Sequence, residues 1–163
     1  MNLTHYANEF LKEHYNLTLD VPIIRNNRLR RSLGRFIWSR DKKPIKIELA
    51  GFLLKYGHEE VIKDILRHEL THYALCRLGL PFQDGHPYFE SELKRQGTSS
   101  TNTIMIGKYY VLMCLNCRDE LVTDNIKHVE HIDDCQSGCC DANLKYVKTI
   151  MSDGINRKTL HTA

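Results

Sequence analysis

The chain has 163 residues, of which 42% are hydrophobic and 26% charged, so it is long enough for one domain with an appendage or for two small domains. This composition is typical of a globular protein and excludes an intrinsically disordered one. The formal net charge of +3 is too small to indicate nucleic-acid binding by itself. No apolar run approaches the ~18 residues that span a bilayer, and residues 1–6 carry no signal-peptide pattern. We therefore expect a cytoplasmic protein without a membrane partner.

The N-terminal third of the chain predicts a helix followed by strands. Residues 3–15 place apolar side chains at helical spacing, which favours an amphipathic helix. Residues 23–50 alternate in the manner of strands, and Gly34 and the stretch 40–44 interrupt them. This pattern predicts a small antiparallel sheet, followed by a short helix over residues 50–56.

Basic side chains are concentrated in the predicted sheet. Residues 25–46 contain nine arginines and lysines against the single acid Asp41. Such a run could contact phosphates of a nucleic acid, or it could be the solvated face of a sheet. The candidate nucleic-acid-binding residues are Arg28, Arg30, Arg31 and Arg35.

A helix is predicted over residues 59–78. Glu59 and Glu60 suit its first turn, where the helix dipole favours negative charge, and Gly79 followed by Pro81 ends it. The apolar residues within it recur at helical spacing, which indicates that one face is buried.

This helix contains the segment His68-Glu69-Leu70-Thr71-His72, an H-E-x-x-H motif. Residues four apart share a helix face, so both imidazoles can bind one zinc ion. Glu69 can then act as the general base of a hydrolase. Leu66 and Leu70 flank the first histidine, which argues against two merely exposed histidines.

A catalytic zinc site needs a third protein ligand and an open position for water. Leu75 and Leu78 stand where a metzincin would carry glycine and histidine, which excludes that class. The candidates that remain are His86, which follows Gly85 in a loop, and Glu90 and Glu92 in a helix predicted over residues 87–96.

The C-terminal part changes character and concentrates the cysteines. We expect a linker over residues 98–107, a zinc ribbon over 108–148 and a tail over 149–163. Cys114 and Cys117 form a C-x₂-C pair, and a second cluster follows at the spacing of a ribbon. The predicted ligands of a structural zinc are Cys114, Cys117, Cys135 and Cys140, with Cys139 an alternative for the last and His128 or His131 as substitutes. Cys76, on the motif helix, is expected to be a small core residue.

These segments together resemble the SprT-like family, whose eukaryotic relative is the protease Spartan. The resemblance rests on Asn26–Phe36, the H-E-x-x-H segment, Gly85-His86-Pro87-Tyr88-Phe89 and the cysteine module, and it extends to about residue 148. It implies a compact α+β metallopeptidase domain in which His86 is the third zinc ligand and Glu69 the catalytic acid and base. Spartan cleaves proteins crosslinked to DNA, so the resemblance also implies DNA as a partner.

We therefore expect an α+β fold, with a small antiparallel sheet packed on helices over residues 1–97 and a zinc ribbon after it. The predicted function is zinc-dependent hydrolysis of peptide bonds in protein or peptide substrates, including proteins associated with nucleic acid. Two zinc ions are expected, one catalytic and one structural. The alternative function is a non-catalytic, zinc-stabilised module that binds nucleic acid.

Overall fold

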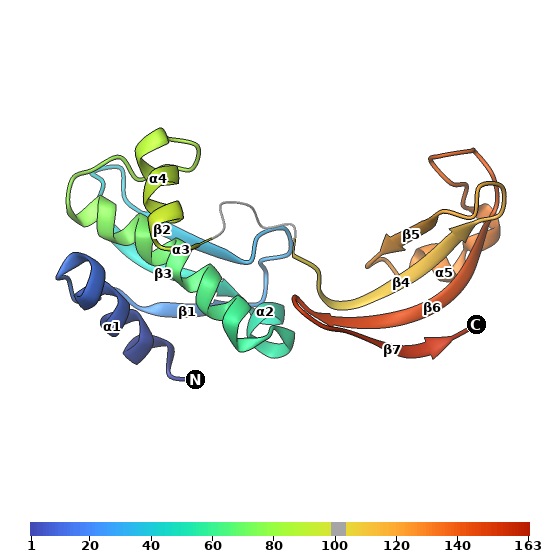
Figure 1. The fold of residues 1–163 in the computed structure, drawn as a ribbon, viewed down its shortest axis with the longest axis horizontal. Helices are drawn as coiled ribbons and strands as arrows, with labels where there is room; N and C mark the ends of the chain where they lie inside the picture. Colours follow the sequence, from blue (N-terminus) through green and yellow to red (C-terminus); the bar gives the residue numbers. More distant parts are fainter. Residues whose placement is uncertain (99–103) are drawn as a thin grey trace. The chain divides into compact units, whose positions relative to one another are not determined.

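A computed structural model describes residues 1–98 and 104–163 (Figure 1). The chain divides into two compact units, Met1–Ile104 and Met105–Ala163. The predicted linker, residues 98–107, falls on this division, but its residues 99–103 lie outside the described part of the chain.

The first unit combines a three-stranded sheet with four helices. Its elements are α1 (Leu3–Tyr15), β1 (Ile23–Asn26), β2 (Gly34–Trp38), β3 (Pro44–Ala50), α2 (Gly51–Tyr56), α3 (Glu59–Arg77) and α4 (Pro87–Arg95). The strand order is β1-β3-β2, so β2 is an edge strand. β2 runs antiparallel to β3, whereas β1 runs parallel to it because the chain reverses direction twice between them. The predicted α+β class is confirmed, and β1 adds a parallel pair to the antiparallel one.

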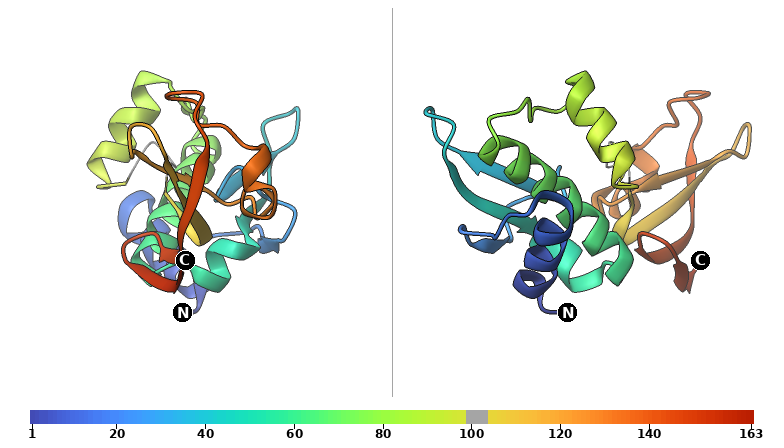
Figure 2. Two further views of the ribbon diagram at one scale, coloured as in Figure 1. Left: turned by 90° about the vertical axis from the view of Figure 1, so that its right-hand side faces the viewer. Right: turned by 60° about the vertical axis from the view of Figure 1, so that its left-hand side comes forward.

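Helix α3 is the centre of this unit. It packs against β2 and β3 and also against α1 and α4 (Figure 2). Thirteen of its nineteen residues are buried, including both motif histidines and Glu69. The His58 side chain caps its first turn by accepting a hydrogen bond from the Glu60 N–H, and Gly79, with φ of 70°, follows its end. The histidines are therefore held on a helix that the rest of the unit encloses.

No helix within residues 1–98 and 104–163 is long and apolar enough to cross a lipid bilayer.

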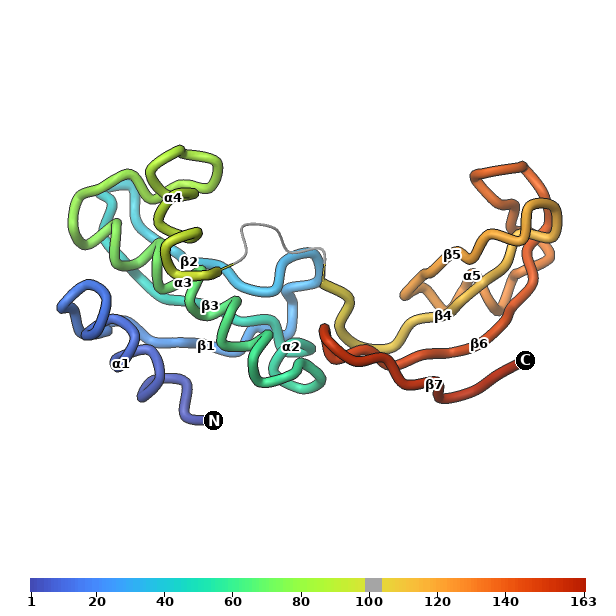
Figure 3. The backbone as a smooth tube through the Cα atoms, viewed as in Figure 1, coloured from blue at the N-terminus to red at the C-terminus, as the bar shows by residue number. Residues whose placement is uncertain are grey.

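The second unit is a four-stranded antiparallel sheet of order β5-β4-β6-β7, which Figure 3 lets the reader trace along the chain. Its elements are β4 (Ile106–Cys114), β5 (Glu120–Thr123), α5 (Lys127–Glu130), a 3₁₀ turn (Ile132–Asp134), β6 (Leu144–Asp153) and β7 (Arg157–Thr162).

Residues 149–163 differ from the tail that we expected. Residues up to Asp153 belong to β6, and β7 pairs with β6 from Arg157 to Thr162. Every residue of β7 is exposed. The strand is therefore ordered by its backbone pairing with β6 and not by burial of apolar side chains. The second unit therefore continues past the predicted end of the ribbon.

Candidate metal centres

The two motif histidines converge with a third side chain from the loop that follows α3. The Nε2 atoms of His68 and His72 lie 3.1 Å apart. Asp84 places its Oδ1 atom 3.2 Å from Nε2 of His68 and 3.4 Å from Nε2 of His72. All three ligand atoms lie within 4.8 Å of one another, so this group can hold a metal ion.

His72 is held in a fixed orientation. Its Nδ1 hydrogen-bonds to the backbone carbonyl of Phe82, and therefore carries the proton. The ring of Phe89 stacks on the imidazole at 4.1 Å and 15°, and Phe36 lies parallel to it at 6.3 Å and 7°. Burial lowers the pKa of His72, which favours the neutral imidazole. These contacts leave Nε2 as the atom with a lone pair directed at the metal position.

Glu69 is buried beside the histidines. Burial raises the pKa of its carboxyl group to about 8, with the charge of Asp84 adding to the rise and a backbone hydrogen bond from Phe36 opposing it. Gly34 on β2 packs directly on this carboxyl group, because a Cβ atom at position 34 would lie 2.7 Å from Oε1 of Glu69. The glycine thus makes room for the glutamate between β2 and α3.

A cavity of about 730 Å³ contains these groups. His68, Glu69 and His72 line it from α3, and Asp84 lines it from the loop. The remaining wall comes largely from β2 and from Phe82. The candidate metal ligands and the buried carboxyl group therefore face a space large enough for part of a substrate.

His86, the third ligand implied by the resemblance, lies outside this group. Its side chain is exposed and caps α4, where Nδ1 accepts a hydrogen bond from the Tyr88 N–H. The residue that the sequence reasoning missed is Asp84, two positions earlier in the same loop. Asp84 could have been considered from the sequence, because aspartate is a zinc ligand and this residue follows the motif helix within a few positions.

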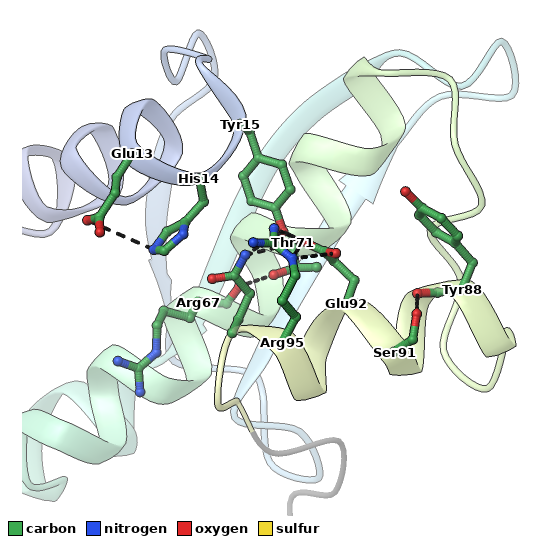
Figure 4. A network of polar contacts seen from close by, with 10 residues as sticks. Glu13, His14, Tyr15, Arg67, Thr71, Tyr88, Ser91, Glu92 and Arg95 are labelled. Atoms are coloured by element: carbon green, nitrogen blue, oxygen red, sulfur yellow. Dashed lines mark hydrogen bonds and ion pairs between the residues drawn. The ribbon is translucent and has the colours of Figure 1, made fainter.

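The two glutamates weighed as alternatives have other partners. Glu90 accepts a hydrogen bond from the N–H of Gly85 and so ties the loop to α4. Glu92 accepts one from the hydroxyl group of Tyr15 at 2.8 Å and pairs with Arg95, as Figure 4 shows. These contacts link α1 to α4, the helix whose Phe89 stacks on His72.

The predicted basic residues fall into two groups. Arg28, Arg30 and Arg31 are exposed, and no ion pair joins them to the described residues. Arg35 instead contacts the buried carboxylate of Glu48 at 2.9 Å. Hydrogen bonds from Lys46, Arg35 and Asn26 lower the pKa of Glu48 to about 2. Arg35 thus shares a single carboxylate with Lys46, and its side chain remains about half exposed.

Four cysteines converge in the second unit: Cys114, Cys117, Cys139 and Cys140. Their sulfur atoms lie within 4.8 Å of one another, and the Sγ atoms of Cys117 and Cys139 are 3.4 Å apart. A hydrogen bond from Ser137 lowers the pKa of Cys114 to about 6, whereas the neighbouring thiol of Cys139 raises the pKa of Cys117 to about 12.

This set contains three of the four predicted ribbon ligands, Cys114, Cys117 and Cys140. Cys139, which was predicted only as an alternative to Cys140, is present beside it, and Cys135 is not part of the set. A turn closed by a hydrogen bond from the Asp141 N–H to the Ser137 carbonyl brings the adjacent Cys139 and Cys140 to the cluster. His128 and His131 are not part of it, and His128 contacts Thr123. Cys76 is buried on α3, in keeping with a core role.

Replacing single cysteines tests which residues hold the second metal. We expect Cys139→Ser to lose one bound metal ion per chain, because it removes a thiolate from the cluster. Cys135→Ser should retain both ions. Elemental analysis of the purified variants measures the difference, and loss of a metal ion from Cys135→Ser alone would contradict the four-cysteine set.

Comparisons with known proteins identify the family of the chain. The family model described as the SprT-like family matches residues 2–104. A protein of Staphylococcus epidermidis named Protein SprT-like is 29% identical over 76% of this chain and 80% of its own length. A Streptococcus sanguinis protein of the same name is 30% identical over 72% of this chain and 79% of its own length. No solved structure matches the chain. The matched region contains the whole first unit with its histidine pair, and the chain belongs to the SprT-like family.

Proposed function

We propose that the protein is a zinc-dependent peptidase. The observation that supports this most strongly is the buried carboxyl group of Glu69 beside two converging imidazoles in a cavity. Two imidazole nitrogens and one carboxylate oxygen are the donor set of many hydrolytic zinc sites, so the residues fit this metal. His68, His72 and Asp84 would hold the ion.

A bound zinc ion would lower the pKa of the water molecule that it coordinates toward ~7 and would polarise the carbonyl group of a peptide bond. Beside a bound cation the Glu69 carboxyl group would ionise, because a nearby positive charge lowers its pKa, and the carboxylate can then accept the proton of the attacking water and pass it to the leaving amine. The Phe82 carbonyl and the Phe89 ring keep His72 oriented throughout. Packing of Gly34 against Glu69 keeps the carboxyl group facing the cavity.

We further propose that the four cysteines hold a second, structural zinc ion. A site with four thiolates has no open position, so it stabilises a small unit and does not catalyse. The exposed Arg28, Arg30 and Arg31 support a role for DNA as a partner. A cytoplasmic location and substrates associated with nucleic acid remain part of the same proposal.

Hydrolysis of an unfolded, labelled polypeptide tests the proposal. We expect new amino termini to appear with the zinc-loaded protein, to stop when a chelator removes the metal, and to return when zinc is added back. The non-catalytic alternative predicts a different result. Full zinc occupancy and salt-dependent binding of DNA, with no new amino termini, would favour a binding module over a peptidase.

A further inference from the structure

A row of side chains on β2 leads away from the catalytic glutamate. Gly34 and Phe36 share one face of the strand, and although the pairing register is irregular between Ile37 and Trp38, the Trp38 ring stacks on Phe36 and so continues the row. Gly34 abuts Glu69, and Phe36 lies parallel to the His72 ring. The irregularity after Ile37 interrupts the ideal strand spacing, so the contact with the Phe36 ring is what places Trp38 at the far end of this row.

Trp38 is packed in place although much of it faces solvent. The residue is 43% exposed, and its indole ring stacks on Phe36 at 5.6 Å and 20° and lies perpendicular to the Phe82 ring at 5.2 Å. All three rings line the cavity that holds the histidines. A large, pre-packed aromatic surface can bind an apolar group at little cost in side-chain entropy.

The charged group on the β2 wall is Arg35. Its half-exposed guanidinium group lines the cavity and shares the Glu48 carboxylate with Lys46. A peptide carboxylate or an acidic side chain would have to compete with that contact. The aromatic rings of Phe36, Trp38 and Phe82 are therefore the part of the cavity wall that suits an apolar group.

The position of β2 in the sheet indicates what kind of molecule carries the apolar group. β2 pairs with β3 on one side only, and no other described strand pairs with it. An extended polypeptide can lie along such an edge, with alternate side chains spaced like those of the strand. A compact ligand would use this geometry less well.

We propose that Phe36, Trp38 and Phe82 form a subsite for one aromatic or large aliphatic side chain of an extended polypeptide substrate. Its place along β2 sets the number of residues between that side chain and the bond that is cut. The part concerning cleavage rests on the proposed peptidase function, whereas the part concerning binding does not.

Trp38 is the only tryptophan of the chain, so its fluorescence reports on this subsite directly. The zinc-loaded Glu69→Gln variant is titrated with flexible Gly- and Ser-rich peptides that carry one Phe, or Ala at the same position. The Phe peptide should change the Trp38 emission and bind about tenfold to a hundredfold more tightly, as expected for burial of one large apolar side chain.

A labelled peptide, followed by fluorescence polarisation, extends the comparison to variants without this tryptophan. In Glu69→Gln, adding Trp38→Ala should reduce the preference for Phe to less than about threefold, and adding Trp38→Phe should restore most of it. The matched control is Tyr56→Ala, which removes an exposed aromatic side chain from α2, outside the cavity, and should leave the preference unchanged.

Cleavage by the otherwise unaltered protein gives a second readout. Moving the Phe by one position along the peptide should move the cut by one position, as mass spectrometry of the products will show. In Trp38→Ala the cuts should scatter. Equal affinity for the two peptides, no binding of either, or a preference that survives Trp38→Ala would overturn the subsite.

The two proposals can fail separately. Phe-dependent binding without hydrolysis by the zinc-loaded protein would support the subsite and contradict the peptidase. Hydrolysis at sites that ignore the position of Phe would support the peptidase and overturn the subsite.

Discussion

Replacing Glu69 with glutamine is expected to lower kcat/KM for peptide hydrolysis by at least about 100-fold, because general acid–base catalysis by a positioned side chain contributes 10²–10⁴ to the rate. The fold should survive the change. Burial raises the pKa of Glu69 to about 8, so the folded protein already tolerates a neutral group there, and glutamine has nearly the shape of the neutral carboxyl group. The zinc content should also be unchanged, since Glu69 is not among the three candidate ligands.

Glu60→Gln is the matched control for this variant. It makes the same chemical change on the same helix, at an exposed position in the first turn whose carboxylate pairs with Lys63. Its kcat/KM should stay within about twofold of the unaltered protein, as is usual for a surface substitution. Hydrolysis by Glu69→Gln at the rate of this control would remove Glu69 from the mechanism.

Asp84→Asn is expected to weaken zinc binding at the histidine site by at least about 100-fold, since loss of an outer hydrogen-bond partner alone costs 10–100-fold and Asp84 would contribute a direct charged ligand. His86→Ser should leave that affinity nearly unchanged. Serine retains an oxygen that can cap α4 by accepting the Tyr88 N–H, so this variant removes the imidazole without removing the cap. Competition with a zinc-binding dye measures both affinities.

The opposite result would identify His86 as the third ligand. If His86→Ser loses the zinc ion and Asp84→Asn keeps it, the ligand implied by family resemblance is correct. The loop from Gln83 to His86 would then have to rearrange on metal binding, and α4 would give up its present cap. Gly85, with φ of 77°, lies within that loop.

A site residue could be predicted from the sequence where contacts between near neighbours in the chain fix its position. It could not be predicted where contacts between distant segments do so. His68, Glu69 and His72 were predictable because one helix sets their spacing, and its apolar periodicity shows which face is buried. The third position was not, because it depends on how a loop without periodicity folds back. Asp84 and His86 are two residues apart in that loop, and only the fold decides which of them meets the histidines.

The same distinction applies to the second unit. The C-x₂-C pair of Cys114 and Cys117 follows from a tight turn, whereas the spacing of the later cysteines allowed several sets. The folded turn after Ser137 selects Cys139 with Cys140 and leaves Cys135 out. Strand β7 was missed because its residues are exposed and its order comes from pairing with β6, which composition does not reveal.

The contact between Gly34 and Glu69 offers a way to sort natural relatives of this chain. A methyl group at position 34 would lie 2.7 Å from Oε1 of Glu69 and 2.9 Å from Cγ2 of Ile65, so a larger residue must displace the glutamate, Ile65 or the strand itself. A homologue that retains both histidines and the glutamate but carries a bulky residue at this strand position is therefore expected to be a degenerate enzyme. Its metal site would persist after its chemistry had been lost, and inspection of the helix motif alone would not reveal the difference.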